Sequence, residues 1–292
     1  MPEDASWSVL RLLNWTTNFF KSQGNDSPRL DAEVLLAESL GCKRIELYAR
    51  FDEVPAAGVR DAFKALVKKR GDGAPVAYLV GRKEFYSLDL AVEEGVLIPR
   101  PETELLVVTA LDRLKERSID APMIADVGTG TGAIAIAIAK HCEAAKVIAI
   151  DVEPRAVALA NKNAETHGVS ERVYATESDL FARLKASRTF DLIVSNPPYV
   201  TTNELIDLEP TVRDHEPHLA LDGGPEGTDV IQRVLAEAPK RLNEGGELLI
   251  EISPMIAERV ESLVQNTPGL DFVAHLKDLA GHIRVTHARK SA

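Results

Sequence analysis

The sequence predicts an α/β protein in two parts, a small helical bundle followed by a parallel sheet that helices cover on both faces. Three observations support this prediction: helical spacing of apolar residues over residues 1–80, a hairpin-like stretch over 81–100, and alternating strand and helix patterns further on. The length of 292 residues suits two domains, and 45% hydrophobic with 27% charged residues is typical of a globular protein with a full core. We therefore expect domains at 1–80 and 101–292, with 81–100 as the linker between them.

The first 80 residues carry the pattern of several short helices. Apolar residues recur at helical spacing within residues 9–20, 30–36 and 63–67, and glycine- or proline-containing breaks separate these segments. Strand signals are few, so we expect a bundle. This part also holds four aromatic side chains that would suit a partner-docking stripe, although the core of a small bundle is their more common place: Trp7, Trp15, Phe19 and Phe20.

The sequence of the linker predicts a β-hairpin, and the residues that follow it predict the start of a helix. Short apolar segments flank residues 93–95, whose Glu-Glu-Gly sequence suits a turn. Arg100 is followed by Pro101 and by the acidic side chains of Glu102 and Glu104. Proline fits the first turn of a helix, and carboxylates there favour the positive end of the helix dipole, so we expect a helix to begin here.

From about residue 122 the chain alternates between strand-like and helix-like segments, without internal repeats or low-complexity stretches. This alternation predicts βα units and therefore a parallel sheet covered on both faces. Seven strands are expected, at residues 123–127, 146–150, 172–176, 190–195, 247–252, 272–275 and 283–286.

Composition and charge exclude some functions and disfavour others. No run of about 18 apolar residues exists, so we expect no membrane span, and residues 1–4 lack the basic start of a secretory signal. Cys42 and Cys142 form no Cys-x-x-Cys motif, which fits a protein of the reducing cytoplasm. Residues 1–80 hold 11 basic and 11 acidic residues, so the remainder carries the whole net charge of −11. That acidity disfavours direct DNA binding, which depends on Lys and Arg.

A glycine-rich loop, Asp-Val-Gly-Thr-Gly-Thr-Gly-Ala at residues 126–133, follows the first of the seven strands and leads into an apolar helix. Its glycines let the backbone turn tightly and approach a ligand, and the free N–H groups of the helix start lie behind it. Asp151 ends the next strand, where a carboxylate can accept hydrogen bonds from both hydroxyls of a ribose. The pattern predicts a nucleoside-containing cofactor, and the loop alone suits S-adenosylmethionine and NAD about equally.

A second motif, Ser-Asn-Pro-Pro-Tyr at residues 195–199, follows the fourth strand and decides between these cofactors. Ligands of open α/β sheets bind beyond the carboxyl ends of the strands. The two prolines remove two N–H donors, so the Asn196 side-chain oxygen and the Pro197 carbonyl can each accept one hydrogen of a planar –NH2 group, while Tyr199 packs on that group. We therefore interpret the motif as a recogniser of an amide or an exocyclic amine.

Methyl transfer is the reaction that such a site favours. An amide nitrogen is a poor nucleophile because its lone pair is delocalised into the carbonyl. Accepting both of its hydrogens places negative charge near the nitrogen and favours rehybridisation as a methyl group arrives from a sulfonium. Catalysis would then rest on positioning and preorganised dipoles, without a dedicated base before the transfer.

With these motifs the chain resembles the protein-glutamine N5-methyltransferases of the HemK/PrmC type, which methylate the glutamine of the Gly-Gly-Gln motif in class I peptide chain release factors. The resemblance covers nearly the whole chain. Asn-Pro-Pro-Tyr is shared with DNA and RNA amino-methyltransferases, but the Arg-Pro-Glu-Thr-Glu and Ala-Leu-Asp-Gly-Gly sequences make the match more specific. The matching stretches lie at residues 31–36, 75–81, 98–104, 126–133, 191–199, 216–224, 245–246 and 278–281.

The resemblance implies a seven-stranded class I S-adenosylmethionine-dependent methyltransferase domain of Rossmann-like type, an N-terminal helical-bundle domain that docks the release factor, and a β-hairpin between them. Asp179 and Leu180 would lie near the adenine, and Asn196, Pro197 and Tyr199 would be the catalytic residues. Substrate-binding residues would be Asn196, Pro197, Pro198, Tyr199, Arg100 and Glu102, with Glu104 nearby; helix capping also explains these acids. Cofactor-binding residues would be Gly128, Thr129, Gly130, Thr131, Gly132, Asp151, Asp179, Leu180 and Asn196.

Some positions depart from the pattern of this family. Leu180 stands where the family often has tryptophan, so adenine stacking would be weaker or supplied elsewhere. Ser253 and Ile256 replace a usual glycine and glutamine, and His282 and Ile283 also differ. The pair His215 and His218 would suit a metal, but without further ligands at fitting spacing we expect a polar loop and no metal.

Several functions remain open at this level. The first is an S-adenosylmethionine-dependent protein-glutamine methyltransferase that acts on release factors, expected to be a cytoplasmic monomer. The second is the enzyme that methylates a glutamine of ribosomal protein uL3. The third is a nucleic-acid exocyclic-amine methyltransferase, which the net charge of −11 disfavours. The last is an inactive cofactor-binding adaptor, against which the intact Asn196 argues.

Overall fold

The computed structural model describes residues 7–291, which form two compact units. The first unit contains the chain up to Gly81 together with Pro210–His215, and the second contains Arg82–Glu209 and residues 216–291. Residues 1–4, on which the expectation of no secretory signal rests, lie outside the described part. Between residues 7 and 291 there is no helix that is both long and apolar enough to cross a membrane.

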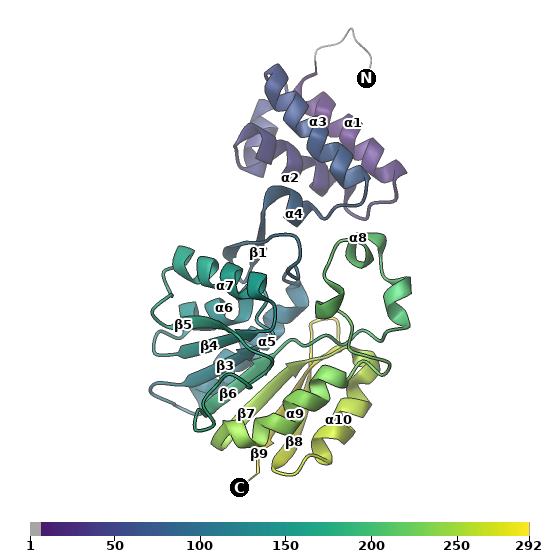
Figure 1. The fold of residues 1–292 in the computed structure, drawn as a ribbon. Helices are drawn as coiled ribbons and strands as arrows, with labels where there is room; N and C mark the ends of the chain where they lie inside the picture. The colour runs from purple at the N-terminus through teal and green to yellow at the C-terminus, as the bar shows by residue number, and fades with distance from the viewer. Residues whose placement is uncertain (1–6, 292) are drawn as a thin grey trace. The chain divides into compact units, whose positions relative to one another are not determined.

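The first unit is helical, as the apolar spacing predicted (Figure 1). The Ser8 hydroxyl caps its first helix by accepting a bond from the Arg11 N–H, and Gly41 ends the second with a positive φ of 61°. Phe20 is buried in the core and Trp7 and Phe19 pack against that core, whereas Trp15 is 40% exposed. The aromatic stripe is thus mostly core. The elements are α1 (Val9–Ser22), α2 (Pro28–Leu40), η1 (Arg44–Arg50), α3 (Ala57–Gly71), α4 (Val76–Val80) and α8 (Pro210–Arg213).

The second unit begins with a hairpin, but the turn lies elsewhere than predicted. Strands β1 (Arg82–Phe85) and β2 (Leu88–Ala91) pair antiparallel, and Tyr86 and Ser87 form the turn with φ values of 50° and 60°. Two successive positive φ angles match the twist of the strands, so the turn forms without the usual Asn-Gly signal. The Glu104 carboxylate stabilises it by accepting the Tyr86 N–H at 2.9 Å. Residues 93–95, the predicted turn, lie in the loop beyond the hairpin.

A seven-stranded sheet in the order β5-β4-β3-β6-β7-β9-β8 forms the centre of this unit (Figure 1). The parallel prediction is confirmed for the first five strands in this order and wrong for β9, which runs against both neighbours. A short turn joins β8 to β9, and such a connection can only join antiparallel strands. The strands are β3 (Met123–Val127), β4 (Lys146–Asp151), β5 (Val173–Glu177), β6 (Phe190–Ser195), β7 (Leu242–Glu251), β8 (Leu270–Lys277) and β9 (Ile283–Lys290).

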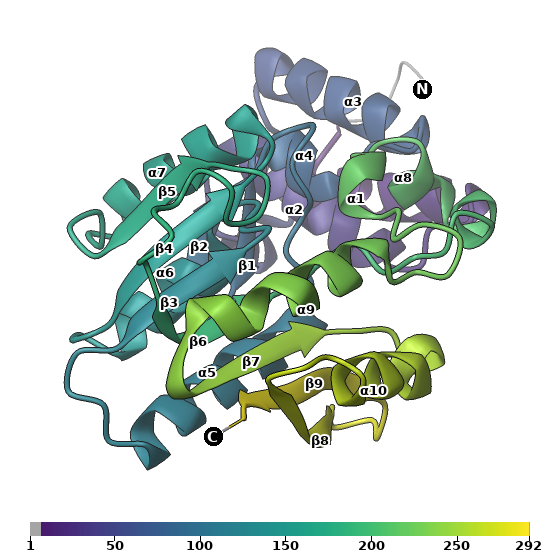
Figure 2. The same cartoon turned by 60° about the horizontal axis from the view of Figure 1, so that its bottom comes forward.

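Helices cover both faces of the sheet. In β6, Leu192 and Val194 join the core of α5, α6 and α7, while Ile193 joins the core of α9 and α10 on the other face. Figure 2 shows α9 and α10 in front of the sheet. Burial on both faces explains why the strands read as continuous apolar runs. The helices are α5 (Glu104–Glu116), α6 (Ala133–His141), α7 (Pro154–Thr166), α9 (Asp229–Arg241) and α10 (Ala257–Gln265), with short turns η2 (Pro101–Thr103), η3 (Glu204–Asp207), η4 (His218–Ala220) and η5 (Pro254–Ile256).

Candidate active site

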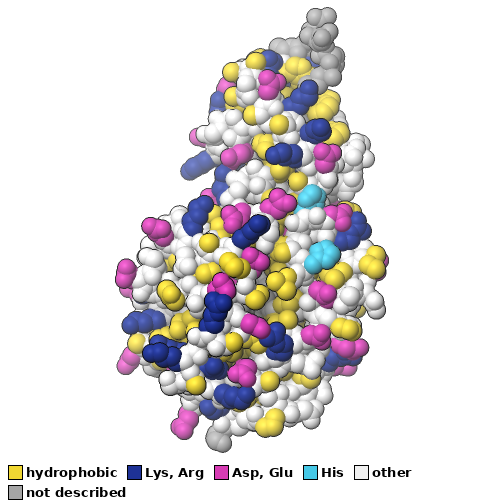
Figure 3. Space-filling view, in the orientation of Figure 1, with side chains coloured by type: hydrophobic (Ala, Val, Ile, Leu, Met, Phe, Trp, Pro, Cys, Tyr) yellow, Lys and Arg dark blue, Asp and Glu magenta, His cyan; other side chains and the backbone are white. Residues whose placement is uncertain are grey.

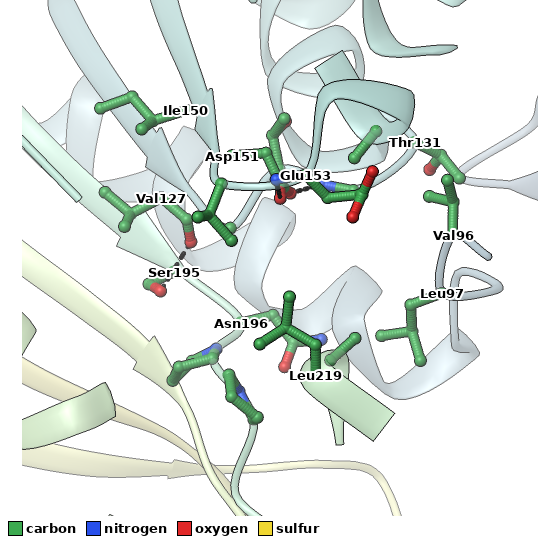
Figure 4. Close-up of a pocket in the computed structure, with 18 of the residues that line it drawn as sticks. Val96, Leu97, Val127, Thr131, Ile150, Asp151, Glu153, Ser195, Asn196 and Leu219 are labelled. Atoms are coloured by element: carbon green, nitrogen blue, oxygen red, sulfur yellow. Dashed lines mark hydrogen bonds between the residues drawn. The ribbon is translucent and has the colours of Figure 1, made fainter. Parts of the chain in front are cut away.

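A cavity of about 340 Å³ lies at the carboxyl ends of β3, β4, β5 and β6, the edge where open α/β sheets bind ligands (Figure 4). Apolar side chains from residues 95–99 and from η4 complete its wall. Many of the residues singled out in the sequence line it: Arg100, Gly128, Thr129, Gly130, Thr131, Asp151, Asp179, Leu180, Asn196, Pro197 and Pro198.

The glycine-rich loop forms the floor of this cavity, between β3 and α6. Gly128, Gly130 and Gly132 all have positive φ, so side chains there would strain the backbone. A Cβ on Gly132 would also lie 3.1 Å from the Ala160 methyl group of α7. Glycine therefore lets α6 start close against α7, with the free N–H groups of its first turn behind the loop.

Two acids, one buried and one partly buried, support the loop. Asp126 Oδ2 accepts the Thr129 hydroxyl at 2.6 Å and the Ala135 N–H at 3.2 Å, while its Oδ1 has no hydrogen-bond partner among the described residues. Burial raises the pKa of Asp126 to about 7. Asp151 Oδ2 accepts the Gly130 N–H at 2.8 Å, and its Oδ1 accepts the Glu153 N–H at 3.0 Å. A carboxylate has about four acceptor sites, so Asp151 retains capacity toward the cavity that it lines.

Residues that follow β5 line one end of the cavity. Leu180 has a φ of 47°, a conformation that turns the chain sharply after Asp179. Both Asp179 oxygens lie 2.7 Å from Nη2 of Arg233 on α9, and this arginine also lines the cavity. Sequence reasoning missed Arg233 because nothing in its local sequence distinguishes it from an ordinary surface arginine of a helix.

The Asn-Pro-Pro-Tyr motif lies where β6 ends. The Ser195 hydroxyl donates to the Val127 carbonyl at 2.7 Å, which ties the end of β6 to β3. Asn196 Nδ2 donates to the Thr103 hydroxyl oxygen at 3.1 Å. With its amide donor held in this way, Asn196 keeps its side-chain oxygen as an acceptor, and Figure 4 shows this side chain at the cavity.

Tyr199 lies differently from the expectation that it packs on the recognised group. It does not line the cavity; its ring packs against the core of α9 and α10, and its hydroxyl donates to Glu251 Oε1 at 3.4 Å. Burial, together with the negative charge of Glu251, raises the pKa of Tyr199 well above its usual value. Tyr199 is thus connected to β7, a strand on which sequence reasoning had placed no functional residue.

The three charged residues of the Arg-Pro-Glu-Thr-Glu segment have separate positions. Arg100 lines the cavity and forms an ion pair with buried Glu216, which also accepts the Ile98 N–H at 3.3 Å. Glu102 is exposed and does not line the cavity. Glu104 supports the hairpin turn, as described above. The fold therefore brings only Arg100 of the three to the cavity.

The remaining sequence candidates lie outside the cavity lining. Ser253 caps η5 by accepting the Met255 N–H, and Ile256 is buried in the core beside α10. His215 lies beside Gly73 in the helical unit, and Glu216 pairs with Arg100. Within residues 7–291, no three His, Cys, Asp or Glu side chains converge in a way that could hold a metal ion.

The strand order and the loop after β3 define a class I methyltransferase fold, and solved structures share it. One is the 16S rRNA N2 G1207 methyltransferase of Thermus thermophilus in complex with AdoMet and guanosine, with a TM-score of 0.53 and 22% identity over 72% of this chain and 50% of that one. Another is the ribosomal protein L11 methylase of Lactobacillus delbrueckii, with a TM-score of 0.50 and 19% identity over 69% and 84%.

Sequence comparisons show the family. Residues 11–81 match the family model of the PrmC N-terminal domain, and residues 102–212 match that of the methyltransferase small domain. The release factor glutamine methyltransferase of Rhodopirellula baltica is 50% identical over 99% of this chain and 98% of its own length. That of Geobacter sulfurreducens is 41% identical over 89% of each. The chain belongs to the family of release factor glutamine methyltransferases.

Proposed function

We propose that this protein transfers a methyl group from S-adenosylmethionine to the side-chain nitrogen N5 of the glutamine in the Gly-Gly-Gln motif of class I release factors. The full-length similarity to release factor glutamine methyltransferases supports this proposal. The observation that carries it is the orientation of Asn196. Its amide donor is held by Thr103, and its acceptor oxygen remains available at a cavity with a glycine-rich floor.

The order of the strands supports a direction for the cofactor in the cavity. Asp151 on β4 suits the ribose, because an acid at this position accepts hydrogen bonds from its hydroxyls. Asn196 at the end of β6 must lie near the transferred methyl group, so the glycine-rich loop between them would hold the methionine part. The adenine then belongs on the β5 side, beside Asp179, Leu180 and Arg233.

The residues of the cavity fit this cofactor in size and in chemistry. The volume of about 340 Å³ lies within the range of small-molecule sites. Asp151 offers acceptors for hydroxyls, and the start of α6 offers free N–H groups for a carboxylate. Arg233 places a planar cation at the adenine end, where the family often has tryptophan; guanidinium planes stack on aromatic rings. Arg233 is therefore our candidate for the stacking partner that Leu180 does not supply.

Catalysis would rest on placing the glutamine amide. Bound S-adenosylmethionine supplies an electrophilic methyl group on a sulfonium. The Asn196 side-chain oxygen and the Pro197 carbonyl would each accept one amide hydrogen, which fixes the nitrogen in line and favours its rehybridisation. These dipoles are in place before the reaction, so they need no reorganisation when charge develops.

The helical unit is proposed to dock the release factor, as the resemblance implies. It exposes several large apolar side chains that a partner would cover: Leu10, Trp15, Leu30, Ile45, Tyr48 and Val54. Figure 3 shows acidic and basic side chains interspersed over the face in view, which together with the net charge of −11 favours a protein partner over DNA. We further propose that the protein acts in the cytoplasm and as a monomer.

A parallel labelling experiment tests this function. The full-length protein is incubated with methyl-labelled S-adenosylmethionine and, separately, with release factors, ribosomal protein uL3 and DNA. We expect label on the Gly-Gly-Gln glutamine and far slower labelling with Asn196→Ala. Label on uL3 or DNA alone would keep methyl transfer and overturn the partner. An absence of label despite intact cofactor binding would favour the inactive adaptor.

A further inference from the structure

Glu251 is a buried acid that the reaction described above does not use. It is the last residue of β7, only 1% exposed, and its strand neighbours β6, with Ser195 opposite Ile250 in the register. The Asn-Pro-Pro-Tyr motif begins one residue after Ser195. Burying a carboxylate costs free energy unless partners compensate, so its presence here calls for a function or a compensating contact.

The contacts of Glu251 lead to both ends of that motif. Tyr199 donates its hydroxyl to Glu251 Oε1 at 3.4 Å. The Thr103 hydroxyl interacts with the same carboxylate and favours its ionised form, although the pair does not have hydrogen-bond geometry in this structure. The Thr103 oxygen accepts the Asn196 amide at 3.1 Å. Glu251 Oε2 is buried and has no partner with hydrogen-bond geometry in the described part of the chain. One carboxylate thus contacts Tyr199 directly and reaches Asn196 through Thr103.

The surroundings of Glu251 act on its pKa in opposite directions. Burial raises its pKa to about 7, and the charge of Glu102 adds to this rise. The Thr103 and Tyr199 hydroxyls and the positive charge of Arg284 act in the opposite direction. Arg284 is itself engaged with Asp278 at 2.9 Å, so it neutralises Glu251 only in part.

We propose that ionised Glu251 is a positioning residue for methyl transfer, which fixes the Asn196 amide through Thr103 and anchors Tyr199 directly. This inference rests on the proposed function. A threonine hydroxyl has one proton to donate. When that proton points to Glu251, the Thr103 oxygen can only accept from Asn196, so the Asn196 acceptor oxygen faces the substrate.

Loss of the negative charge weakens this constraint, because a protonated carboxyl group accepts more weakly and can itself donate its proton to the Thr103 oxygen. Thr103 can then donate to the Asn196 side-chain oxygen, and the Asn196 amide can turn its –NH2 group toward the cavity. A donor would then face the –NH2 group of the glutamine, and two donors cannot form a hydrogen bond. The amide would lose the contact that holds it in line for methyl transfer.

Kinetics of full-length variants test the proposal. We expect Glu251→Ala and Thr103→Val each to lower kcat about 10- to 100-fold, as misplacement of a reacting group does, with the cofactor Kd changed less than about threefold. Thr103→Ser keeps the hydroxyl and should keep most of kcat. The double variant should lose little more than either single one, because both changes remove the same proposed contact between Glu251 and Thr103. Additive losses, or a wild-type kcat in Glu251→Ala, would overturn the proposal.

A pH profile separates this role from a purely structural one. The kcat of the wild type should rise as the pH increases through about 7, because the ionised form is the active one. Glu251→Gln should lack this rise; a rise that persists belongs to another group and contradicts the proposal. Glu247→Gln changes another buried acid on the same strand, one that does not line the cavity, and should keep the wild-type profile. If wild type and Asn196→Ala are equally inactive on release factors, the proposed function fails instead.

Discussion

Two buried glutamates on β7, four residues apart, have opposite surroundings. Glu247 is fully buried and lies within 3.3 Å of three cationic or potentially cationic groups, on Arg113, His287 and Arg289. Burial would raise its pKa, but the hydrogen bonds from Arg113 and Arg289 and the nearby His287 outweigh burial and hold the pKa far below its usual value. Glu251 is surrounded by hydroxyls and by a second acid, and burial raises its pKa to about 7.

We infer from this difference that Glu247 has a structural role and Glu251 a functional one. The cations around Glu247 compensate its burial, and they join β7 to α5 and β9. Glu251 stands at the carboxyl end of the same strand, next to the candidate active site, and is left without such compensation. Perturbed acids without a full set of partners are typical of functional sites.

The largest effect is expected inside the site. Asn196→Ala should lower kcat by about 100- to 1000-fold, because one preorganised contact to the reacting group is lost. The cofactor Kd should change by less than about threefold, since the contacts that bind the cofactor before the reaction are retained. Steady-state kinetics and calorimetry measure the two quantities. Equal losses of turnover and cofactor binding would contradict the role of Asn196.

The next effect concerns stability at Glu247. Glu247→Ala should lower the free energy of unfolding by about 3 kcal/mol, because Arg113 and Arg289 then lose their buried partner. Urea unfolding measures this, and kcat of the folded variant should stay near that of the wild type. Glu116→Ala is the matched control, since Glu116 pairs with the same Arg113 at the surface and should cost less than about 1 kcal/mol. Equal losses in the two variants would remove the contrast.

The pH dependence of stability due to Glu251 should have the opposite sign to that due to Glu247, because the pKa of Glu251 is raised and that of Glu247 is lowered. Its folded pKa of about 7 lies above the ordinary 4.5, so its stabilising contribution is full below pH 4.5 and is lost as the pH rises through 7. Glu251→Gln cannot titrate. The unfolding free energy of the variant relative to the wild type should therefore increase between pH 5 and 8, by about 1–3 kcal/mol. Asp126 titrates in both proteins, so its contribution cancels from the difference in unfolding free energy. A constant difference would show that Glu251 is not perturbed.

The smallest effect is expected at an exposed pair. Arg233 and Asp179 are each more than half exposed, so their ion pair should contribute little to stability. Arg233→Ala should nevertheless weaken cofactor binding by about 1 kcal/mol, or about fivefold in Kd, if the guanidinium stacks on adenine. Arg233→Lys keeps the charge but not the plane and should lie close to the alanine variant. A wild-type Kd in both would exclude the stacking role.

Much of the fold and part of the site could be predicted from the sequence. The seven strands and the two motifs depend on residues that are adjacent in the chain, so local spacing suffices to find them. The position of the hairpin turn was predicted wrongly because Tyr86 and Ser87 are not usual turn residues. The direction of β9 was predicted wrongly because it depends on the short connection that joins β8 to β9. Tyr199 also lies outside the cavity lining, since its hydroxyl bonds to a strand that its own sequence neighbours do not indicate.

The sequence by itself determined the helical first part, the βα alternation, the glycine-rich loop and the Asn-Pro-Pro-Tyr motif at a strand end. Only the tertiary structure decided which distant side chains support them. Thr103 meets Asn196 across 93 residues of chain, Arg233 meets Asp179 across 54, and Glu251 meets Tyr199 across 52. These contacts follow from the order of strands in the sheet and from the packing of helices on it. Burial and neighbouring charge set the protonation of an acid, so its chemistry emerges only when the chain is folded.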